Sequence, residues 1–341
     1  MSKKKILVTG GAGYIGAHTV IELINGGFEP VVIDNLSRSD HTLLKGIESI
    51  TGQKTDFWEG DCCDKKFVTK VFSDAGPFSS VLHFAAYKSV GESVQKPLMY
   101  YQNNINSLLT LLEVMKVNAV SDFIFSSSCT VYGQPDHIPV NESAPFKKAE
   151  SAYGSTKQMC ERILEDAATS GLRVVSLRYF NPIGAHPSAL IGELPLGTPN
   201  NLVPYITQTA AGVRDKLTVF GNDYDTPDGS CVRDFIHVVD LGIAHVKAMQ
   251  YLANRTEKQL YEPFNLGSGI GISVLQLIER FKAVTKVNVP FVIGPRRAGD
   301  VVKVYADPAK INMALGWRTQ FSIDESLLHA WQWEKKLRKI N

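Results

Sequence analysis

A strand that runs into a glycine-rich turn constrains the fold of this chain more than any other feature. Residues 5–16 read KILVTGGAGYIG, an apolar run followed by Gly10, Gly13 and Gly16. Glycine tolerates positive φ and lets backbone N–H groups approach a pyrophosphate at a helix N-terminus. The motif alone fits a purely structural turn equally well. Asp34, which ends the next strand at the spacing of roughly 20 residues typical of dinucleotide sites, favours the nucleotide-binding interpretation.

Apolar runs alternate with helical patterns through the first half of the chain. This alternation predicts parallel strands joined by right-handed crossovers, and therefore an α/β fold with a Rossmann-type, doubly wound parallel sheet. The expected strands are 6–9, 30–33, 55–59, 81–84, 123–126 and 174–177, and the clearest helical patterns are 19–25, 97–117 and 153–170.

The pattern changes after residue 180. Residues 181–200 are rich in proline and glycine and predict a long loop. Shorter elements follow, with helices expected near 203–213, 239–253, 273–286 and 324–339 and a strand near 217–220. We expect residues 1–180 to form the dinucleotide-binding domain. Residues 181–341 should form mainly a smaller mixed α/β lobe over the carboxyl edge of the sheet, with part of the chain crossing back to it.

Composition and charge argue against several classes of partner, namely nucleic acids, membranes and metal ions. The chain of 341 residues is 44% hydrophobic and 21% charged, with a net charge of +2, which gives no electrostatic case for nucleic acid or an anionic membrane. The apolar run after the basic N-terminus is short for a signal peptide, and no run approaches the ~18 residues of a membrane span. The five cysteines lack metal-site spacing, so we expect reduced thiols, no metal and a cytoplasmic location.

Acidic residues at strand ends indicate which dinucleotide is bound. A carboxylate at Asp34 would accept hydrogen bonds from an adenosine ribose diol and repel a 2′-phosphate, which favours NAD over NADP. Arg38 complicates that preference, because it lies close enough in sequence to meet such a phosphate. Asp61 has two interpretations: a contact with the adenine edge, or the N-cap of a helix over 65–74.

Tyr153 and Lys157 form the candidate chemical centre, since residues four apart lie on one face of a helix. An adjacent ammonium and the positive ring of an oxidised nicotinamide would lower the phenol pKa and make Tyr153 a general base. A Tyr-x-x-x-Lys pair is nevertheless common by chance. Residues 126–128 are three serines after a predicted central strand; they indicate either a turn or a hydroxyl, Ser128, near Tyr153.

Several long motifs, in order along nearly the whole chain, resemble the extended short-chain dehydrogenase/reductase family and, within it, the UDP-galactose 4-epimerases. They are VTGGAGYIGAHT (8–19), VIDNLS (32–37), HFAAYKSVGESVQKPLMYYQNN (83–104), FIFSSSCTVYG (123–133), AYGSTK (152–157), RYFNPIGAHPS (178–188), PNNLVPYI (199–206), VFGNDYDTPDG (219–229), VRDFIHVVDL (232–241) and PRRAGD (295–300).

The resemblance implies the reaction. Family members oxidise the C4 hydroxyl of a UDP-sugar with tightly held NAD, let the 4-keto sugar turn over, and return the hydride to its opposite face. Carried onto this chain, Tyr153 is the base, Lys157 orients the nicotinamide ribose and lowers the Tyr153 pKa, Ser128 binds the reacting oxygen, and Thr130 supports them. Family members are usually homodimers, with 97–117 and 153–170 as the candidate interface helices.

The resemblance also implies two sets of binding residues. The positions that correspond to NAD contacts are Gly10, Gly13, Tyr14, Ile15, Gly16, Asp34, Asn35, Asp61, Cys62, Phe84, Ala85, Lys88, Asn103, Tyr153, Lys157 and Tyr179. The positions that correspond to UDP-sugar contacts are Ser128, Tyr153, Asn181, Asn201, Leu202, Phe220, Arg233, Phe235, Arg297, Asp300 and Val304.

Two positions differ from the family pattern, and a third bears on which sugar is accepted. Tyr87 stands where a smaller residue is usual, and Phe235 where the family often has Tyr. Val304 aligns with the residue that borders the sugar's C2 substituent, where Tyr is associated with plain hexoses and a smaller residue with N-acetylhexosamines. We therefore expect UDP-Glc and UDP-Gal as substrates, with room for UDP-GlcNAc and UDP-GalNAc, unless Val304 is only a packing residue.

Sister reactions share the cofactor and the Tyr–Lys pair. The 4,6-dehydratases of nucleotide sugars and the decarboxylases of nucleotide-uronic acids need a carboxylate just after the hydroxyl residue, where this chain has Ser128, Cys129 and Thr130. A non-catalytic NAD-binding regulator is a third alternative, but such proteins commonly lose the Tyr or the Lys, and both are present here.

Overall fold

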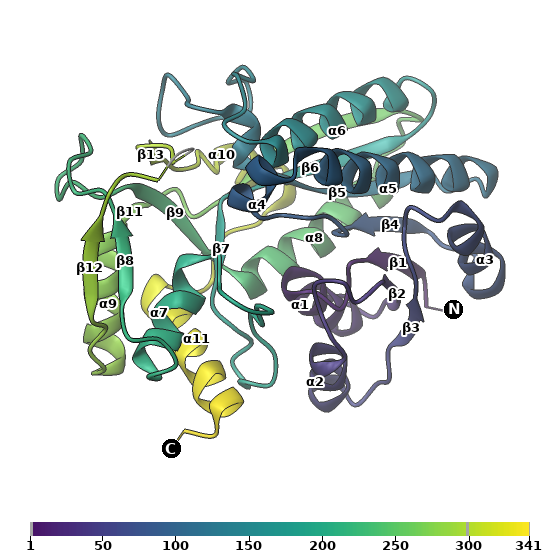
Figure 1. Ribbon diagram of the computed structural model, residues 1–341. Helices are drawn as coiled ribbons and strands as arrows, with labels where there is room; N and C mark the ends of the chain where they lie inside the picture. The colour runs from purple at the N-terminus through teal and green to yellow at the C-terminus, as the bar shows by residue number, and fades with distance from the viewer. Residues whose placement is uncertain (1–2, 298–299, 341) are drawn as a thin grey trace.

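Seven parallel strands form the central sheet of the protein (Figure 1). The computed structural model describes residues 3–297 and 300–340. The strands are β1 (Lys5–Thr9), β2 (Glu29–Asp34), β3 (Asp56–Glu59), β4 (Ser80–His83), β5 (Asp122–Ser128), β6 (Arg173–Tyr179) and β10 (Leu260–Leu266). Their order is β10-β6-β5-β4-β1-β2-β3, and every neighbouring pair is parallel. The order reverses between β1 and β4, which is where ligands bind in doubly wound sheets.

Helices cover both faces of this sheet, so the strands at its centre are largely apolar and buried. One face carries α1 (Tyr14–Asn25), α2 (Thr42–Thr51) and α8 (Val238–Ala253), and the other carries α3 (Lys65–Ala75), α5 (Pro97–Val117) and α6 (Ala152–Ala168). Ile6, Leu7 and Val8 of β1 are fully buried between these layers. The six strands and three helices expected in the first half are confirmed, although α1 begins directly after the glycine turn.

The second half of the chain contributes to both parts of the molecule. Strand β10 extends the central sheet beside β6, α8 packs on α1, and α10 (Ala309–Leu315) packs on α8 and β10. The expected return of the chain to the sheet is thus seen, whereas the division into domains at residue 180 stays a prediction.

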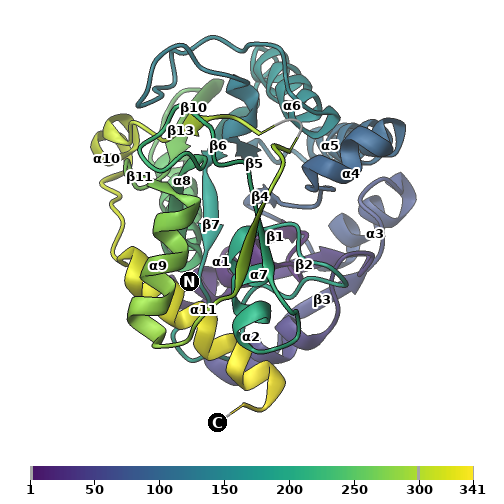
Figure 2. The ribbon, with the colours of Figure 1, turned by 60° about the vertical axis from the view of Figure 1, so that its left-hand side comes forward.

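The remaining elements build a smaller lobe around its own apolar core (Figure 2). They are β7 (Asn181–Ile183), α7 (Leu202–Ala210), β8 (Leu217–Phe220), β9 (Val232–His237), β11 (Gly271–Ser273), α9 (Val274–Thr285), β12 (Phe291–Gly294), β13 (Lys303–Val304) and α11 (Ile323–Arg338). Strand β9 pairs with β7, β11 and β13, and β8 pairs with β12. Figure 2 shows α9 and α11 side by side; each begins with a capping box, Ser273–Gln276 and Ser322–Glu325.

Two short helices follow the neighbouring strands β4 and β5. Helix α4 (Val90–Gln95) precedes α5, and the 3₁₀ helix η1 (Cys129–Tyr132) follows β5 directly. The expected loop over 181–200 begins with the three residues of β7 and is otherwise irregular. No helix within residues 3–297 and 300–340 is long and apolar enough to cross a bilayer.

Candidate active site

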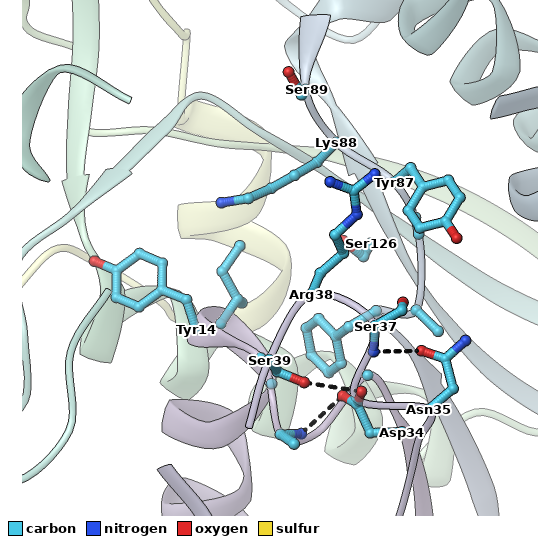
Figure 3. Close-up of a pocket in the computed structure, with 18 of the residues that line it drawn as sticks. Tyr14, Asp34, Asn35, Ser37, Arg38, Ser39, Tyr87, Lys88, Ser89 and Ser126 are labelled. Carbon is cyan, nitrogen blue, oxygen red and sulfur yellow. Dashed lines mark hydrogen bonds between the residues drawn. The ribbon is translucent and has the colours of Figure 1, made fainter. Parts of the chain in front are cut away.

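A cleft of about 360 Å³ opens at the carboxyl ends of β1 and β4, a size within the range of small-molecule sites. Every residue that the sequence analysis assigned to cofactor contact lines this cleft. Figure 3 shows part of it, with Asp34 and Ser39 on one side and Tyr87 and Lys88 on the other. The order reversal of the sheet therefore brings these segments together, although they are far apart in the sequence.

The glycine turn shapes the floor of the cleft. Gly10 has a φ of +72°, and a Cβ there would lie 2.7 Å from the backbone nitrogen of Ala85. A Cβ on Gly16 would overlap the carbonyl oxygen of Gly10. Gly13 is the N-cap of α1 and provides no side-chain cap, so the N–H groups of the first turn are left for a ligand. This cradle fits a pyrophosphate.

The Asp34 carboxylate is fixed at the end of β2. Its Oδ1 accepts hydrogen bonds from Leu36 N and Ser39 Oγ, both at 3.0 Å, and its Oδ2 accepts one from Ala12 N at 3.1 Å. Burial raises the pKa of Asp34, and these three hydrogen bonds oppose the rise. Carboxylate oxygens accept more than one hydrogen bond each, so Asp34 retains capacity for a ribose diol.

Arg38 and Tyr87 were left without a clear role by the sequence, and they contact each other. The Arg38 guanidinium lies 4.9 Å from the centre of the Tyr87 ring, and its Nη2 donates to both carboxylate oxygens of Glu92 at 2.9 Å. Tyr100 completes the group by donating from its hydroxyl to Glu92 at 2.9 Å. Arg38 is thus engaged by α4, which removes the complication it posed for NAD.

Asp61 is not the N-cap of α3, so that interpretation was wrong. Asp64 caps the helix by accepting from Lys66 N and Phe67 N. Asp61 instead accepts from Cys63 N at 2.7 Å and from the Asn35 side-chain amide at 3.1 Å. It lines the cleft, and its contact with the base of a nucleotide stays a prediction.

Tyr153 and Lys157 lie in the first two turns of α6 and both line the cleft. Ser151 caps this helix by accepting from Gly154 N, which fixes where the helix begins. Lys157 Nζ lies 5.8 Å from the centre of the Tyr153 ring and donates to the backbone carbonyl of Ser126. Helix α6 and the end of β5 are therefore joined at the chemical centre.

The pKa shifts only partly match the expectation. Burial lowers the pKa of Lys157 to about 8, and the neighbouring Cys160 and Glu161 oppose this. Burial raises the pKa of Tyr153, although the nearby Ser128 hydroxyl acts in the other direction. The protein groups alone thus do not give the lowered phenol pKa that we expected, because desolvation outweighs them. The positive charge of a bound, oxidised nicotinamide is the remaining factor that would lower the pKa of Tyr153.

Two hydroxyl residues lie at the end of β5 and just after it, and neither is among the residues that line the cleft. Ser128 is buried, and its Oγ accepts from Thr130 N at 3.2 Å at the start of η1. The Thr130 hydroxyl is buried and has no hydrogen-bond partner within the part of the chain that the structure describes. No group of three or more His, Cys, Asp or Glu side chains among residues 3–297 and 300–340 is arranged to hold a metal ion.

The residues assigned to the UDP-sugar fall into separate groups. Asn201 lines the cleft, and Leu202 begins α7 beside it. Arg297 lies over the Phe220 ring at 5.3 Å and 2.8 Å from Asp300, which also lies 3.6 Å from Arg233. These four residues form one cluster, outside the lining of the cleft.

Three further assigned residues are held inside the protein. The Asn181 amide donates to the backbone carbonyl of Asp234 at 3.0 Å. Phe235 is 3% exposed in the core of the smaller lobe, and Val304 is 5% exposed in a small core with Tyr132 and Phe180. Neither Phe235 nor Val304 lines the cleft, so their contact with substrate stays a prediction.

The sequence analysis missed Glu193, which lines the cleft from the loop after β7. Its Oε1 accepts from Lys88 Nζ at 3.2 Å and from the Asn201 amide at 2.5 Å. A single acidic residue in a loop rich in proline and glycine gives no signal of its own. Glu193 is recognised as a site residue only from the folded structure, in which its loop lies against Lys88.

A glycine cradle, an acidic strand end and a Tyr–Lys pair in one cleft define a dinucleotide-binding protein of the short-chain dehydrogenase/reductase type. Residues 7–329 match the family described as GDP-mannose 4,6 dehydratase. A UDP-glucose 4-epimerase of Dictyostelium discoideum is 48% identical over 97% of this chain and 95% of its own length.

Solved structures agree with these relatives. A UDP-glucose 4-epimerase from Bifidobacterium longum, in complex with NAD+ and UDP, is 42% identical and superposes with a TM-score of 0.95 over 99% of this chain and 100% of that one. The UDP-Glc/GlcNAc 4-epimerase of Campylobacter jejuni is 37% identical, with a TM-score of 0.82 over 98% and 99% of the two chains. The chain belongs to the UDP-glucose 4-epimerase family.

Proposed function

We propose that this chain interconverts UDP-glucose and UDP-galactose by transient oxidation at sugar C4, with NAD as a tightly bound cofactor. The observation that carries the proposal is that the glycine cradle of α1 and the Tyr153–Lys157 pair of α6 line the same cleft. Relatives with this name that match nearly the whole chain support it.

The residues of the cleft fit NAD. Gly10, Gly13 and Gly16 would hold the pyrophosphate at the start of α1, and Asp34 would accept from the adenosine ribose. Arg38, the cation near Asp34 in sequence, is paired with Glu92 and is therefore less available to a 2′-phosphate. When bound, NAD would supply a hydride acceptor at sugar C4 and give the hydride back.

The side chains at the end of β5 and on α6 would handle the proton. Tyr153 takes the proton from the C4 hydroxyl and later returns it. Lys157, held by the Ser126 carbonyl, places positive charge beside the phenol and binds the nicotinamide ribose. Ser128 donates to the reacting oxygen, and Thr130, whose hydroxyl has no partner among the residues that the structure describes, would support this group.

The Arg233–Arg297 cluster is our candidate for the diphosphate site. Asp300 holds both guanidinium groups close together, and such paired arginines suit the oxygens of a diphosphate. Phe220 is 41% exposed beneath Arg297 and offers an apolar surface to the uridine. Asn181, Asn201 and Leu202 would complete the site on the side of the sugar.

We also propose that the protein accepts UDP-GlcNAc and UDP-GalNAc. The support is Val304, a residue smaller than Tyr at the position that borders the C2 substituent. A UDP-Glc/GlcNAc 4-epimerase among the structural neighbours is consistent with this wider range.

The sister reactions are less well supported by the site. The segment from Ser128 to Thr130 carries no carboxylate, which a 4,6-dehydratase or a decarboxylase would need there. The description of the matched family names a dehydratase, whereas the curated relatives are named epimerases. A non-catalytic regulator is also less well supported, because such proteins commonly lose the Tyr or the Lys and this chain has both Tyr153 and Lys157.

The partner that we propose is a second copy of this chain, in the cytoplasm. Leu98 and Leu109 on α5 are 74% and 40% exposed, and Met159 on α6 is 47% exposed. Ile105 and Leu112, both partly buried, lie on the same stripe of α5 as the exposed leucines. The two helices pack side by side on the outside of the sheet (Figure 1), so together they offer a broad apolar surface.

The test is conversion of UDP-galactose to UDP-glucose by the purified protein without added NAD, with the UDP-GlcNAc/UDP-GalNAc pair run in parallel. Conversion of both pairs is the expected result. Conversion of the hexoses alone would retain the epimerase and remove the hexosamine proposal. If neither pair is converted, even with NAD added, the assignment as an epimerase fails.

A further inference from the structure

A fully buried carboxylate lies directly behind the chemical centre. Glu161 is 1% exposed and accepts hydrogen bonds from three side chains on three strands. Arg178 of β6 donates from Nε at 3.0 Å and from Nη2 at 2.6 Å, Tyr261 of β10 donates at 2.6 Å, and Ser127 of β5 donates from its hydroxyl. A side chain with this many partners has one orientation.

The position of Glu161 ties it to the candidate catalytic residues. It follows Lys157 by one helical turn and Tyr153 by two, so all three share one face of α6. Two successive turns of α6 are therefore joined to two successive residues of β5. Lys157 binds the carbonyl of Ser126, and Glu161 binds the hydroxyl of Ser127. The next residue along the strand is Ser128.

Stability alone does not account for this arrangement. A buried ion pair costs desolvation, and apolar pairs of similar size often stabilise a fold equally well. The neighbouring strands already carry a second Arg–carboxylate pair, Arg173 with Asp122, at 2.7 and 2.8 Å. That pair joins β5 to β6 at the opposite end of the strands, away from the cleft.

We propose that Glu161, together with Arg178, is a positioning residue for the epimerase reaction. It holds α6 in the register against β5 that places the Tyr153 phenol and the Ser128 hydroxyl on the same reacting oxygen. This inference rests on the function proposed above.

The same carboxylate also affects the charge on Lys157. Burial lowers the pKa of Lys157 to about 8, while Cys160 and Glu161 raise it. Replacing Glu161 by glutamine removes that support and leaves the positive Arg178 nearby, so Lys157 loses its proton at a lower pH. The other titratable groups around the Tyr153–Lys157 pair are His83 on β4, Tyr100 on α5, Cys129 in η1 and Tyr179 on β6.

The test compares Glu161→Gln with Asp122→Asn, a matched change in the other pair. For Glu161→Gln we expect kcat to fall on the order of 10- to 100-fold, as small displacements of reacting groups do, with KM for UDP-galactose changed less than about twofold. The alkaline limb of the kcat profile should move to lower pH. Asp122→Asn should lower the unfolding temperature but leave kcat and the pH profile unchanged.

Two further measurements separate positioning from loss of structure. The NAD content of each purified variant should equal that of the wild type, because Glu161 does not line the cofactor cleft. The double variant Glu161→Leu/Arg178→Met, which removes both charges of this pair, should fold and still show the low kcat.

Wild-type kcat in either Glu161 variant, or an equal loss of kcat in Asp122→Asn, would overturn the proposal. An inactive wild type would instead refute the proposed function.

Discussion

The guanidinium of Arg38 lies 2.9 Å from both carboxylate oxygens of Glu92, and this pair joins the loop after β2 to helix α4 at the cleft. Tyr87, a departure from the family pattern, lies under the guanidinium and so supports the pair. Hydrogen bonding with Arg38 lowers the pKa of Glu92, which keeps the carboxylate charged at neutral pH. The two sides of the cofactor cleft are therefore connected by a polar bridge.

Breaking this bridge should speed the loss of NAD. Arg38 is about half exposed, and exposed ion pairs contribute roughly 0.2–1 kcal/mol. We expect Arg38→Ala to raise the rate of NAD release by up to about fivefold, which corresponds to the upper value. Release is measured by dilution into an NAD-consuming assay. The control is Arg280→Ala, which breaks the exposed pair with Asp324 on the smaller lobe and should leave the rate unchanged.

The sequence predicted most of the central sheet because its strands are short apolar runs. Strand β10 escaped prediction because residues 260–266 read LYEPFNL, with a glutamate and a proline in the run. Pro263 is tolerated because β10 is an edge strand, where one row of N–H groups needs no partner in the sheet. An edge position depends on tertiary structure and leaves no local signal.

The candidate site was predictable where a motif fixes the backbone and less so where distant side chains meet. Gly10 and Tyr153 belong to motifs, and both line the cleft. The contacts of Glu193 with Lys88 and of Glu161 with Tyr261 join segments far apart in the sequence. Burial, which opposes the expected lowering of the Tyr153 pKa, depends on how the whole fold packs, and periodicity does not report it.

Removing the Tyr153 hydroxyl should abolish most of the turnover and leave the fold intact. General acid–base catalysis contributes typically 10²- to 10⁴-fold, and we expect Tyr153→Phe to lower kcat within that range. Steady-state conversion of UDP-galactose measures the effect, and the NAD content should stay at the wild-type value. Tyr251→Phe, a change on the far end of α8, is the matched control and should retain full activity.

Activity should fall above a pH of about 8, where Lys157 loses its proton. The pKa of this group is lowered in the folded protein, so between that value and its ordinary pKa the unfolded chain binds more protons. The contribution of Lys157 to the free energy of unfolding therefore rises with pH over the same range. A kcat profile combined with urea unfolding at each pH checks both signs. A fall in activity that follows a fall in stability would contradict this account.

Charging the apolar surface of α5 and α6 should yield a monomer. Leu109→Glu with Met159→Glu places two carboxylates in the proposed interface, which disfavours burial against a second copy. Light scattering coupled to gel filtration should then report half the mass of the wild type. Met313→Glu, at an 81% exposed position on α10, serves as the control and should leave the mass unchanged. If the wild type itself runs as a monomer, the proposed interface is wrong.

Replacing Val304 by tyrosine distinguishes a specificity residue from a packing residue. If the side chain borders the C2 substituent, Val304→Tyr should lose activity on UDP-GlcNAc and keep it on UDP-glucose. If it only packs against Tyr132 and Phe180, the larger ring should overfill that core, costing typically 1–3 kcal/mol and lowering both activities together. Val304→Ile controls for a modest increase in volume. We expect the selective loss, measured as the ratio of kcat/KM for the two sugars; a Val304→Tyr variant that keeps its N-acetylhexosamine activity would refute the specificity role.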